Sequence, residues 1–342
     1  MPATTVQSNL WGMTMQKKFR FAAALAVAGI ALNVAGPARA QTYPSHAITI
    51  VLPVPPGGLT DAIARILGDH MRTSLGQPLI VESVPGAGGS IAVDRVTRAV
   101  ADGYTLSIGS WLSHVGAGAI YPARYDVTKD LEPIARLADV PLIMTARKDF
   151  PAKDLKEVVA YLRANPDKVS FATAGPGSAS HVIGVHFQRL TGTRFQFVPF
   201  RGGAPAIQSL VAGHVDLYFG DGGVSLPPIQ GGLIKAYAVS SKTRWLGARD
   251  LPTMDEAGVP GLDLSFWHGL WAPKGTPQDI IAKLNLAVVA ALADPAVRQR
   301  LADLGQELPP REQQTPEALR AYHMAEIEKW WPIIKAANIK GE

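Results

Sequence analysis

Short apolar runs rich in β-branched residues alternate with longer stretches of helical periodicity along most of the chain. The first run, residues 48–52, is followed by a turn rich in Pro and Gly, and an amphipathic helical pattern begins at Thr60. Runs of this kind predict strands, and apolar positions three and four residues apart predict helices. The predicted strands are residues 48–52, 78–82, 104–108, 141–146, 169–173, 195–200, 215–219, 233–239 and 264–271, and further helices are predicted at 90–100, 155–164, 181–190, 206–212, 277–293, 296–304 and 316–337.

This alternation of strands and helices predicts an α/β fold with mainly parallel sheets and helices on both faces. In such sheets, ligands bind beyond the carboxyl ends of the strands. Turns rich in Gly and Ser follow the strands that end at residues 52, 108, 173, 200 and 219. The sequence therefore predicts one ligand cleft, formed by these turns.

Two of these turns have the composition of an anion-binding site. Residues 55–58 open one helix, and residues 174–178 open another. Gly lets the backbone approach a ligand closely, and a helix N-terminus offers unpaired N–H groups and partial positive charge. Neither turn contains Arg or Lys, so the pattern favours one carboxylate held by neutral donors. The alternative interpretation is a pair of tight strand-to-helix turns, with Thr60 and Ser178 as helix caps.

The N-terminus has the pattern of a secretory signal peptide. A basic segment, residues 17–20, precedes an apolar run, residues 21–34, which is too short to span a membrane, and Ala38-Arg39-Ala40 follows. We expect cleavage after Ala40 and a mature protein that begins at Gln41 in a bacterial periplasm. The start codon is Met1, Met13 or Met15.

Length, charge and cysteine content narrow the function further. A chain of 342 residues predicts two lobes rather than one core. Four of the 33 basic residues and none of the 28 acidic residues lie in the signal peptide, so the mature chain is close to neutral and nucleic acid is not expected as a partner. The sequence contains no Cys, so we expect no disulfide, lipoprotein anchor, thiol catalysis or Cys-ligated metal.

Motifs for cofactors, metals and hydrolysis are incomplete. Gly86-Ala87-Gly88 lacks the third Gly of a dinucleotide fingerprint because Ile91 occupies that position, and no P-loop or H-E-x-x-H sequence occurs. His181 and His186 are five residues apart and do not share a helix face, so we expect no metal and no cofactor. Ser178 with His181 leaves a secreted serine hydrolase as the alternative function, although a capping Ser178 and a packed His181 would explain the same pair.

The combination of motifs resembles the periplasmic solute-binding proteins of tripartite tricarboxylate transporters, often called Bug receptors. The resemblance covers essentially all of residues 43–340. The motifs that carry it are Tyr43-Pro44, residues 55–61 (PPGGLTD), 76–78 (GQP), 85–89 (PGAGG), 102–106 (DGYTL), 174–181 (AGPGSASH), 198–202 (VPFRG), 251–253 (LPT) and 269–273 (GLWAP).

Members of that family are two-lobed, hinge-closing receptors with a type II-like periplasmic binding protein fold. The resemblance implies that residues 41–142 and 266–342 form lobe one and that residues 143–265 form lobe two. It places the hinge crossings near Ile143 and Phe266 and the ligand cleft between the lobes. It further implies a receptor that is not an enzyme, works as a monomer and delivers a small carboxylate to permease subunits in the membrane.

In the family, the loops that match residues 55–61 and 175–181 face each other across the cleft. They hold a ligand carboxylate through backbone amides, hydroxyls and ordered water. Arg201 could serve a second carboxylate, and Ser110 lies in the loop after the third predicted strand. The two facing loops contribute the candidate binding residues Gly57, Gly58, Thr60, Asp61, Gly177, Ser178, Ser180 and His181.

Two positions depart from the family pattern. Trp111 follows Ser110 where small residues are usual, and the loop after Phe219 reads Gly220-Asp221-Gly222. In the cleft, Trp111 would offer a flat apolar face, and Asp221 would repel a second carboxylate or attract an amine; alternatively, Trp111 packs elsewhere. We therefore expect a small mono- or dicarboxylate with an apolar or aromatic body, bound unaltered. A hydrolase would turn over carboxyl esters. A structural or chaperone-like periplasmic protein would neither bind such an acid nor turn over esters.

Overall fold

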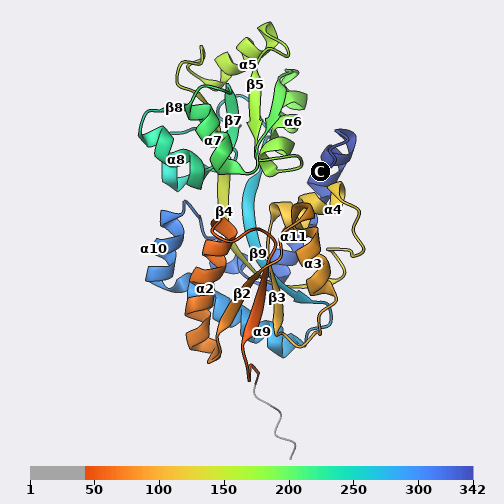
Figure 1. The fold of residues 1–342 in the computed structure, drawn as a ribbon. Helices are drawn as coiled ribbons and strands as arrows, with labels where there is room; N and C mark the ends of the chain where they lie inside the picture. Colours follow the sequence, from red (N-terminus) through yellow and green to blue (C-terminus); the bar gives the residue numbers. More distant parts are fainter. Residues whose placement is uncertain (1–42, 342) are drawn as a thin grey trace, which may run out of the picture. The chain divides into compact units, whose positions relative to one another are not determined.

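Strand β4 (Leu131–Arg147) links the two halves of the fold because it changes partners along its 17 residues. Its first part, as far as Pro141, lies antiparallel to β9 (Ser265–Pro273). Its remainder lies between β7 (Leu217–Asp221) and β8 (Ile234–Val239), and both pairings are antiparallel. Strands β4 and β9 therefore run between the two sheets, as Figure 1 shows.

The computed structural model describes residues 43–341, and the chain from Pro44 onward forms one compact unit. The predicted signal peptide, the cleavage site after Ala40 and the alternative start residues lie outside the described residues. All statements about elements and contacts below therefore concern residues 43–341.

The first sheet combines strands from both ends of the described chain. Its order is β2-β1-β3-β9-β4, in which β1 is parallel to β2 and β3, and β9 is antiparallel to its neighbours β3 and β4. Four of the five residues of β1 are buried, as expected for a parallel strand that is covered on both faces. The elements of this half are β1 (Ile48–Leu52), α2 (Leu59–Leu75), β2 (Leu79–Ser83), α3 (Ser90–Thr97), β3 (Thr105–Ser110), α4 (Ala117–Ile120), α9 (Gln278–Ala293), α10 (Pro295–Asp303) and α11 (Pro316–Ala336).

The second sheet has the order β6-β5-β7-β4, and β8 pairs with the same β4. Strand β5 is parallel to β6 and β7, so their carboxyl ends point the same way. Each of these parallel strands is followed by a helix, which brings several helix N-termini to one edge. The remaining elements are α5 (Leu155–Ala164), β5 (Ser170–Thr173), α6 (Ala179–Thr191), β6 (Gln196–Pro199), α7 (Gly203–Val211) and α8 (Gly222–Gln230).

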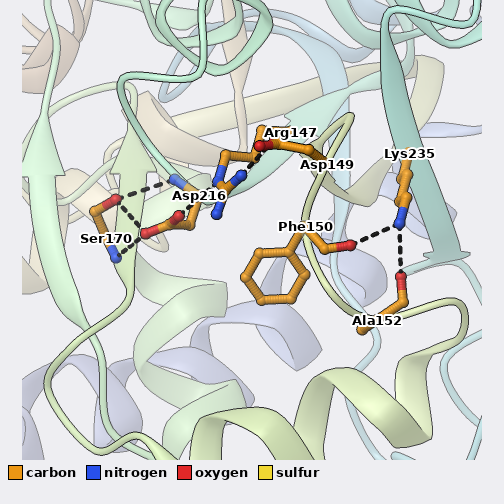
Figure 2. A network of polar contacts seen from close by, with 7 residues as sticks. All are labelled: Arg147, Asp149, Phe150, Ala152, Ser170, Asp216 and Lys235. Carbon is orange, nitrogen blue, oxygen red and sulfur yellow. Dashed lines mark hydrogen bonds and ion pairs between the residues drawn. The ribbon is translucent and has the colours of Figure 1, made fainter.

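A polar network fixes the opposite edge of the second sheet, where β5 and β7 begin (Figure 2). Arg147 Nε lies 2.8 Å from an oxygen of Asp216, and the same guanidinium pairs with Asp149. The Asp216 carboxylate also accepts bonds from the N–H and the hydroxyl of Ser170, at 2.8 and 2.7 Å. Lys235 Nζ donates to two backbone carbonyls in the loop after β4. These bonds join the end of β4 to the beginnings of β5, β7 and β8, at the edge opposite to the carboxyl ends of β5 and β7.

The fold confirms the predicted α/β class with two lobes, although β4 and β9 make the sheets more mixed than expected. Strand β4 begins at Leu131, whereas the sequence predicted a strand only from residue 141. The first part was not predicted because Pro133 and Pro141 interrupt the pattern that is typical of a strand. Helix α8 was not predicted because it contains Pro227 and Pro228, and proline is unfavourable within a helix.

Neither a membrane-spanning helix nor a metal cluster is found in the described part of the chain. No single helix there is long and apolar enough to cross a membrane, and α9 and α10 meet such a test only as a pair bent by 74°. No group of three or more His, Asp or Glu residues between 43 and 341 is arranged to hold a metal ion.

Candidate functional site

A cavity of about 520 Å³ lies at the carboxyl ends of strands from both sheets, where ligands bind in folds of this class. Its volume suits a small organic molecule. One side of its wall consists of the loop after β1 and the residue after Trp111. The other side consists of the turns after β5 and β6, the first residues of the helices that follow them and the end of β7, and β4 and β9 contribute one residue each. The wall comprises residues 54–60, Leu112, Leu142, Ala174, residues 178–180, 202–203, 218–219, Asp221 and Phe266.

The N-terminus of α2 opens onto this cavity without a side-chain cap. Gly57 has a φ of 89°, which favours glycine, and the N-cap residue Gly58 makes no side-chain hydrogen bond. The N–H groups in the first turn of a helix have no acceptor within the helix. Those of Leu59 and Thr60, both in the wall, can therefore donate to an anion.

Asp61 shapes this loop and does not line the cavity. Its carboxylate accepts a bond from the N–H of Gly57 at 2.9 Å and pairs with Arg65 Nε at 2.9 Å. The hydrogen bond from Arg65 is the main cause of the lowered pKa of Asp61, so the carboxylate is ionised at neutral pH. The Asp61 carboxylate is therefore paired with the N–H of Gly57 and with Arg65.

Thr60 contacts a residue that sequence analysis missed. Its Oγ1 lies 3.1 Å from Nε2 of His268 in β9, and both side chains are buried. Burial lowers the pKa of His268 to about 3, so its ring is neutral at neutral pH. The two residues are 208 positions apart in sequence. They meet through strand pairing rather than through any spacing motif.

The N-terminus of α6 contributes the second group of donors. Ser178 is the N-cap residue, and its Oγ donates to the carbonyl of Gly175 at 2.7 Å. It also lies 3.0 Å from the Oγ of Ser180, which accepts a bond from the N–H of Ala174 at 2.8 Å. The two hydroxyls thus brace the loop, and the N–H groups of Ala179 and Ser180 in the first helical turn have no acceptor within the helix.

His181 is not placed as a base for Ser178. Its Nδ1 accepts a bond from the N–H of Gly177 at 3.0 Å, while its backbone N–H donates to Ser178 Oγ at 3.3 Å. Burial lowers the pKa of His181, so the ring is neutral at neutral pH. Gly177 has a φ of 74°, which explains why this position carries Gly. The pair is a helix cap with a packed imidazole, and this arrangement does not support the hydrolase alternative.

The N-terminus of α7 and the end of β7 complete the wall. Gly202, with a φ of 110°, is the N-cap residue of α7 and makes no side-chain hydrogen bond. Asp221 Oδ1 accepts a bond from the N–H of Val224 at 3.2 Å and so caps α8. Burial is the main cause of the raised pKa of Asp221. Among the wall residues there is no Arg, Lys or His, so an anion bound here would depend on backbone N–H and hydroxyl groups.

Trp111 and Ser110 lie outside the wall of this cavity, so ligand contact by either residue stays a prediction. Trp111 is fully buried, and its ring stands edge-on to that of Trp330 at a centroid distance of 5.8 Å. The chain turns helical directly after β3, so Trp111 points into the core and Leu112 reaches the cavity instead. Ser110 is 2% exposed. This position favours the alternative interpretation, in which Trp111 packs in the core.

The structure brings half of the predicted site residues to one cavity. Gly177 and His181 stabilise the loop before α6, as Asp61 does the loop before α2. Arg201 is exposed and lies next to Gly202 but outside the wall. Binding of a second ligand carboxylate by Arg201 therefore stays a prediction. Ligand contact also stays a prediction for the predicted residues that form the wall, which are Gly57, Gly58, Thr60, Ser178, Ser180 and Asp221.

The sequence matches a family of transport receptors. The model of the tripartite tricarboxylate transporter family receptor matches residues 63–339. BugT of Bordetella pertussis is 35% identical over 321 residues, which cover 92% of this chain and 98% of BugT. A UPF0065 protein of Agrobacterium vitis is 37% identical over 328 residues, which cover 94% of this chain and 93% of that protein.

Solved structures of similar proteins have the same fold. MatC from Rhodopseudomonas palustris with bound malate has a TM-score of 0.76 and 40% identity, covering 85% of this chain and 100% of MatC. The periplasmic binding protein BugD has a TM-score of 0.76 and 38% identity, covering 88% of this chain and 100% of BugD. Another R. palustris protein, with adipate, has a TM-score of 0.77 and 31% identity, covering 88% of this chain and 100% of that protein.

Proposed function

Because the chain belongs to the tripartite tricarboxylate transporter receptor family, we propose that its cavity binds a small carboxylate at the N-termini of α2 and α6. Receptors of this family are periplasmic solute-binding proteins that work with membrane permeases. The observation that carries the proposal is a wall that contains the N-terminus of α2, which has no side-chain cap, the N-terminus of α6 and hydroxyl groups, but no basic side chain. Such donors suit a single carboxylate group.

The rest of the wall supports a ligand with a hydrocarbon body. Leu112, Leu142, Phe219 and Phe266 lie in the wall, and their apolar surface fits methylene groups or a ring. Malate and adipate, which occupy two of the similar structures, are small acids of this general size. We therefore infer a small carboxylate with an apolar or aromatic portion, held reversibly and released unaltered.

The hinge belongs to the same proposal. We place it where β4 changes partners after Pro141 and where β9 begins at Ser265. Lobe one would then comprise residues 41–142 and 266–342, and lobe two residues 143–265. Ligand binding should favour a closed arrangement of the lobes, which small-angle scattering would detect as a smaller radius of gyration. An unchanged radius with saturating ligand would contradict hinge closure.

Export and assembly complete the proposal. We expect cleavage after Ala40, so the exported protein should begin at Gln41, and we expect it to be a monomer that passes its ligand to permease subunits. Intact-mass measurement of protein from the periplasm tests the cleavage site. A species that retains residues 17–40 would contradict it.

Thermal-shift measurements on residues 41–342 with a panel of acids test the binding function. The panel consists of acetate, butanoate, succinate, malate, adipate, benzoate and citrate, and an acid that binds only the folded state raises the melting temperature. Gly58→Asp is a sharp control because a Cβ at Gly58 meets no atom within 4 Å. The new carboxylate would cap α2 favourably and repel an anion from the same N–H groups.

Gly58→Asn is the matched variant, since Asn has nearly the same shape, caps a helix equally well and carries no charge. We expect Gly58→Asp to abolish the response to acids and Gly58→Asn to retain most of it. Incubation with the methyl esters of the same acids separates the two functions, because a receptor leaves the esters intact whereas a hydrolase releases the acids. Binding that persists in Gly58→Asp, or no response to any acid of the panel, would contradict the proposed site.

A further inference from the structure

Asp221 is the acidic residue of the cavity wall, whereas Glu307 and Glu326, which are also partly buried without an ion pair among the described residues, lie outside that wall. Asp61, Asp139 and Glu132 each have a basic partner, which is Arg65 for Asp61, Arg136 for Asp139 and both Lys274 and Arg320 for Glu132. Within residues 43–341, no ion pair involves Asp221. Carboxylates in the interior are nearly always paired with a cation. This one therefore lacks the group that would normally balance it.

The two oxygens of Asp221 have different surroundings. Oδ1 accepts the capping bond from the N–H of Val224. Oδ2 faces Gly203, since a Cβ built on Gly203 would lie 3.6 Å from Oδ2 and 3.2 Å from the hydroxyl oxygen of Tyr218. Gly203 has no side chain to cover Oδ2, and even a methyl group at this position would contact both oxygens. Gly203, Tyr218 and Asp221 all belong to the cavity wall, so Oδ2 lies beside the cavity.

We propose that Asp221 selects carboxylates that carry an ammonium group and that the ligand supplies the missing cation. The proposal rests on the proposed function, because the carboxylate of the ligand would be held by the helix N-termini described above. Its ammonium group would then pair with Asp221 Oδ2. A plain dicarboxylate would instead bring its second negative charge toward Asp221 with no basic side chain in the wall to offset it.

Matched acids that differ only at the far end test this selection. The four-carbon set is butanoate, 4-aminobutanoate and succinate, and the six-carbon set is hexanoate, 6-aminohexanoate and adipate. For calorimetric titrations of residues 41–342 at pH 7, we expect in at least one set that the amino acid binds about tenfold or more tightly than the diacid.

Asp221→Asn removes the charge and keeps a good helix cap, so the variant should fold. It should weaken binding of the amino acid about tenfold and strengthen binding of the diacid. Asp154→Asn is the matched control, because Asp154 caps α5 through the N–H of Glu157 at 2.8 Å and is not a wall residue. It should leave the ratio of the two affinities unchanged.

Two other outcomes are distinguishable. Tighter binding of the diacid than of the amino acid by the unsubstituted protein, or an unchanged ratio in Asp221→Asn, would overturn the role of Asp221 and leave the receptor function standing. If no acid binds either the unsubstituted protein or Asp221→Asn, the proposed function and this inference are both overturned.

Discussion

The contact between His268 and Thr60 predicts which proton the cavity offers to a ligand. His268 Nδ1 is buried without a hydrogen-bond partner among the described residues, whereas Nε2 lies 3.1 Å from Thr60 Oγ1. Buried N–H groups without an acceptor are rarer in proteins than buried acceptors without a donor. We therefore place the single ring proton on Nε2, which then donates to Oγ1. The hydroxyl proton of Thr60 remains for a ligand carboxylate.

Thr60→Val removes this hydroxyl while preserving the shape of the side chain. A hydrogen bond to a charged group contributes about 1.5–3 kcal/mol, which corresponds to roughly a ten- to hundredfold change in Kd. We expect Thr60→Val to weaken the best acid of the panel within this range, and Thr60→Ser to bind it within a few-fold of the unsubstituted protein. His268→Leu should weaken binding less, because the hydroxyl is present but no longer oriented. Calorimetric titration at pH 7 measures all three.

His268→Gln is the control for the ring, since its amide nitrogen can donate from near the position of Nε2. Melting temperatures recorded beside each titration exclude unfolding as the cause of a weaker signal. Nitrogen-15 spectra of the eight histidines report the tautomer directly, with His268 assigned by its absence from His268→Gln. A proton on Nδ1, or an unchanged affinity in Thr60→Val, would refute the reasoning.

Three further predictions concern stability and selectivity. The pKa of His323 is about 4 and that of His268 about 3, mainly because burial disfavours the charged ring, whereas the unfolded chain binds these protons near pH 6.5. The free energy of unfolding should therefore fall as the pH drops below about 6.5, by at most about 1.4 kcal/mol per pH unit for each of the two histidines. A urea midpoint that stays constant from pH 7 to pH 5 would contradict this prediction. Ser178→Ala should lower the free energy of unfolding by about 1–2 kcal/mol, and Ser178→Thr should restore it in urea titrations. Ser178→Ala should weaken the binding of acids less than Thr60→Val does, because the Ser178 hydroxyl already donates to the carbonyl of Gly175. Trp111→Ala should cost about 3–5 kcal/mol of unfolding free energy without changing the ratio of benzoate to succinate affinity, and a selective loss of benzoate would support the stacking role.

Much of the fold is predictable because its elements carry local signals. Strand β1 matches the predicted residues 48–52, and α5 matches residues 155–164, since each has a clear apolar pattern with turn residues at its ends. Strand β4 lacks such a signal near Pro133 and Pro141, and only its partners on both sides reveal its full length. Local propensity fails there because tertiary pairing decides the conformation.

The candidate site divides in the same way. Gly57, Gly58 and Ser178 were predictable because each lies in a turn that directly follows a strand and opens a helix. The roles of Phe266 and His268 were not, since β9 brings Phe266 to the cavity and His268 to Thr60 from a distant part of the sequence. The sequence leaves open whether Trp111 lies in the cleft or packs elsewhere, because it does not reveal the π-helical turn that follows β3. In the structure, Trp111 lies in the core and Leu112 lines the cavity.

The position of β9 in the first sheet has a consequence for the order in which the protein can fold. It lies between β3 and β4, although every strand of the second sheet precedes it in the chain. Until residue 265 and those after it leave the ribosome, β3 and the first part of β4 keep an unpaired edge, and the long separation between partners slows their pairing further. The first sheet can therefore be completed only after every strand of the second sheet has been synthesised, although β1, β2 and β3 come first in the chain.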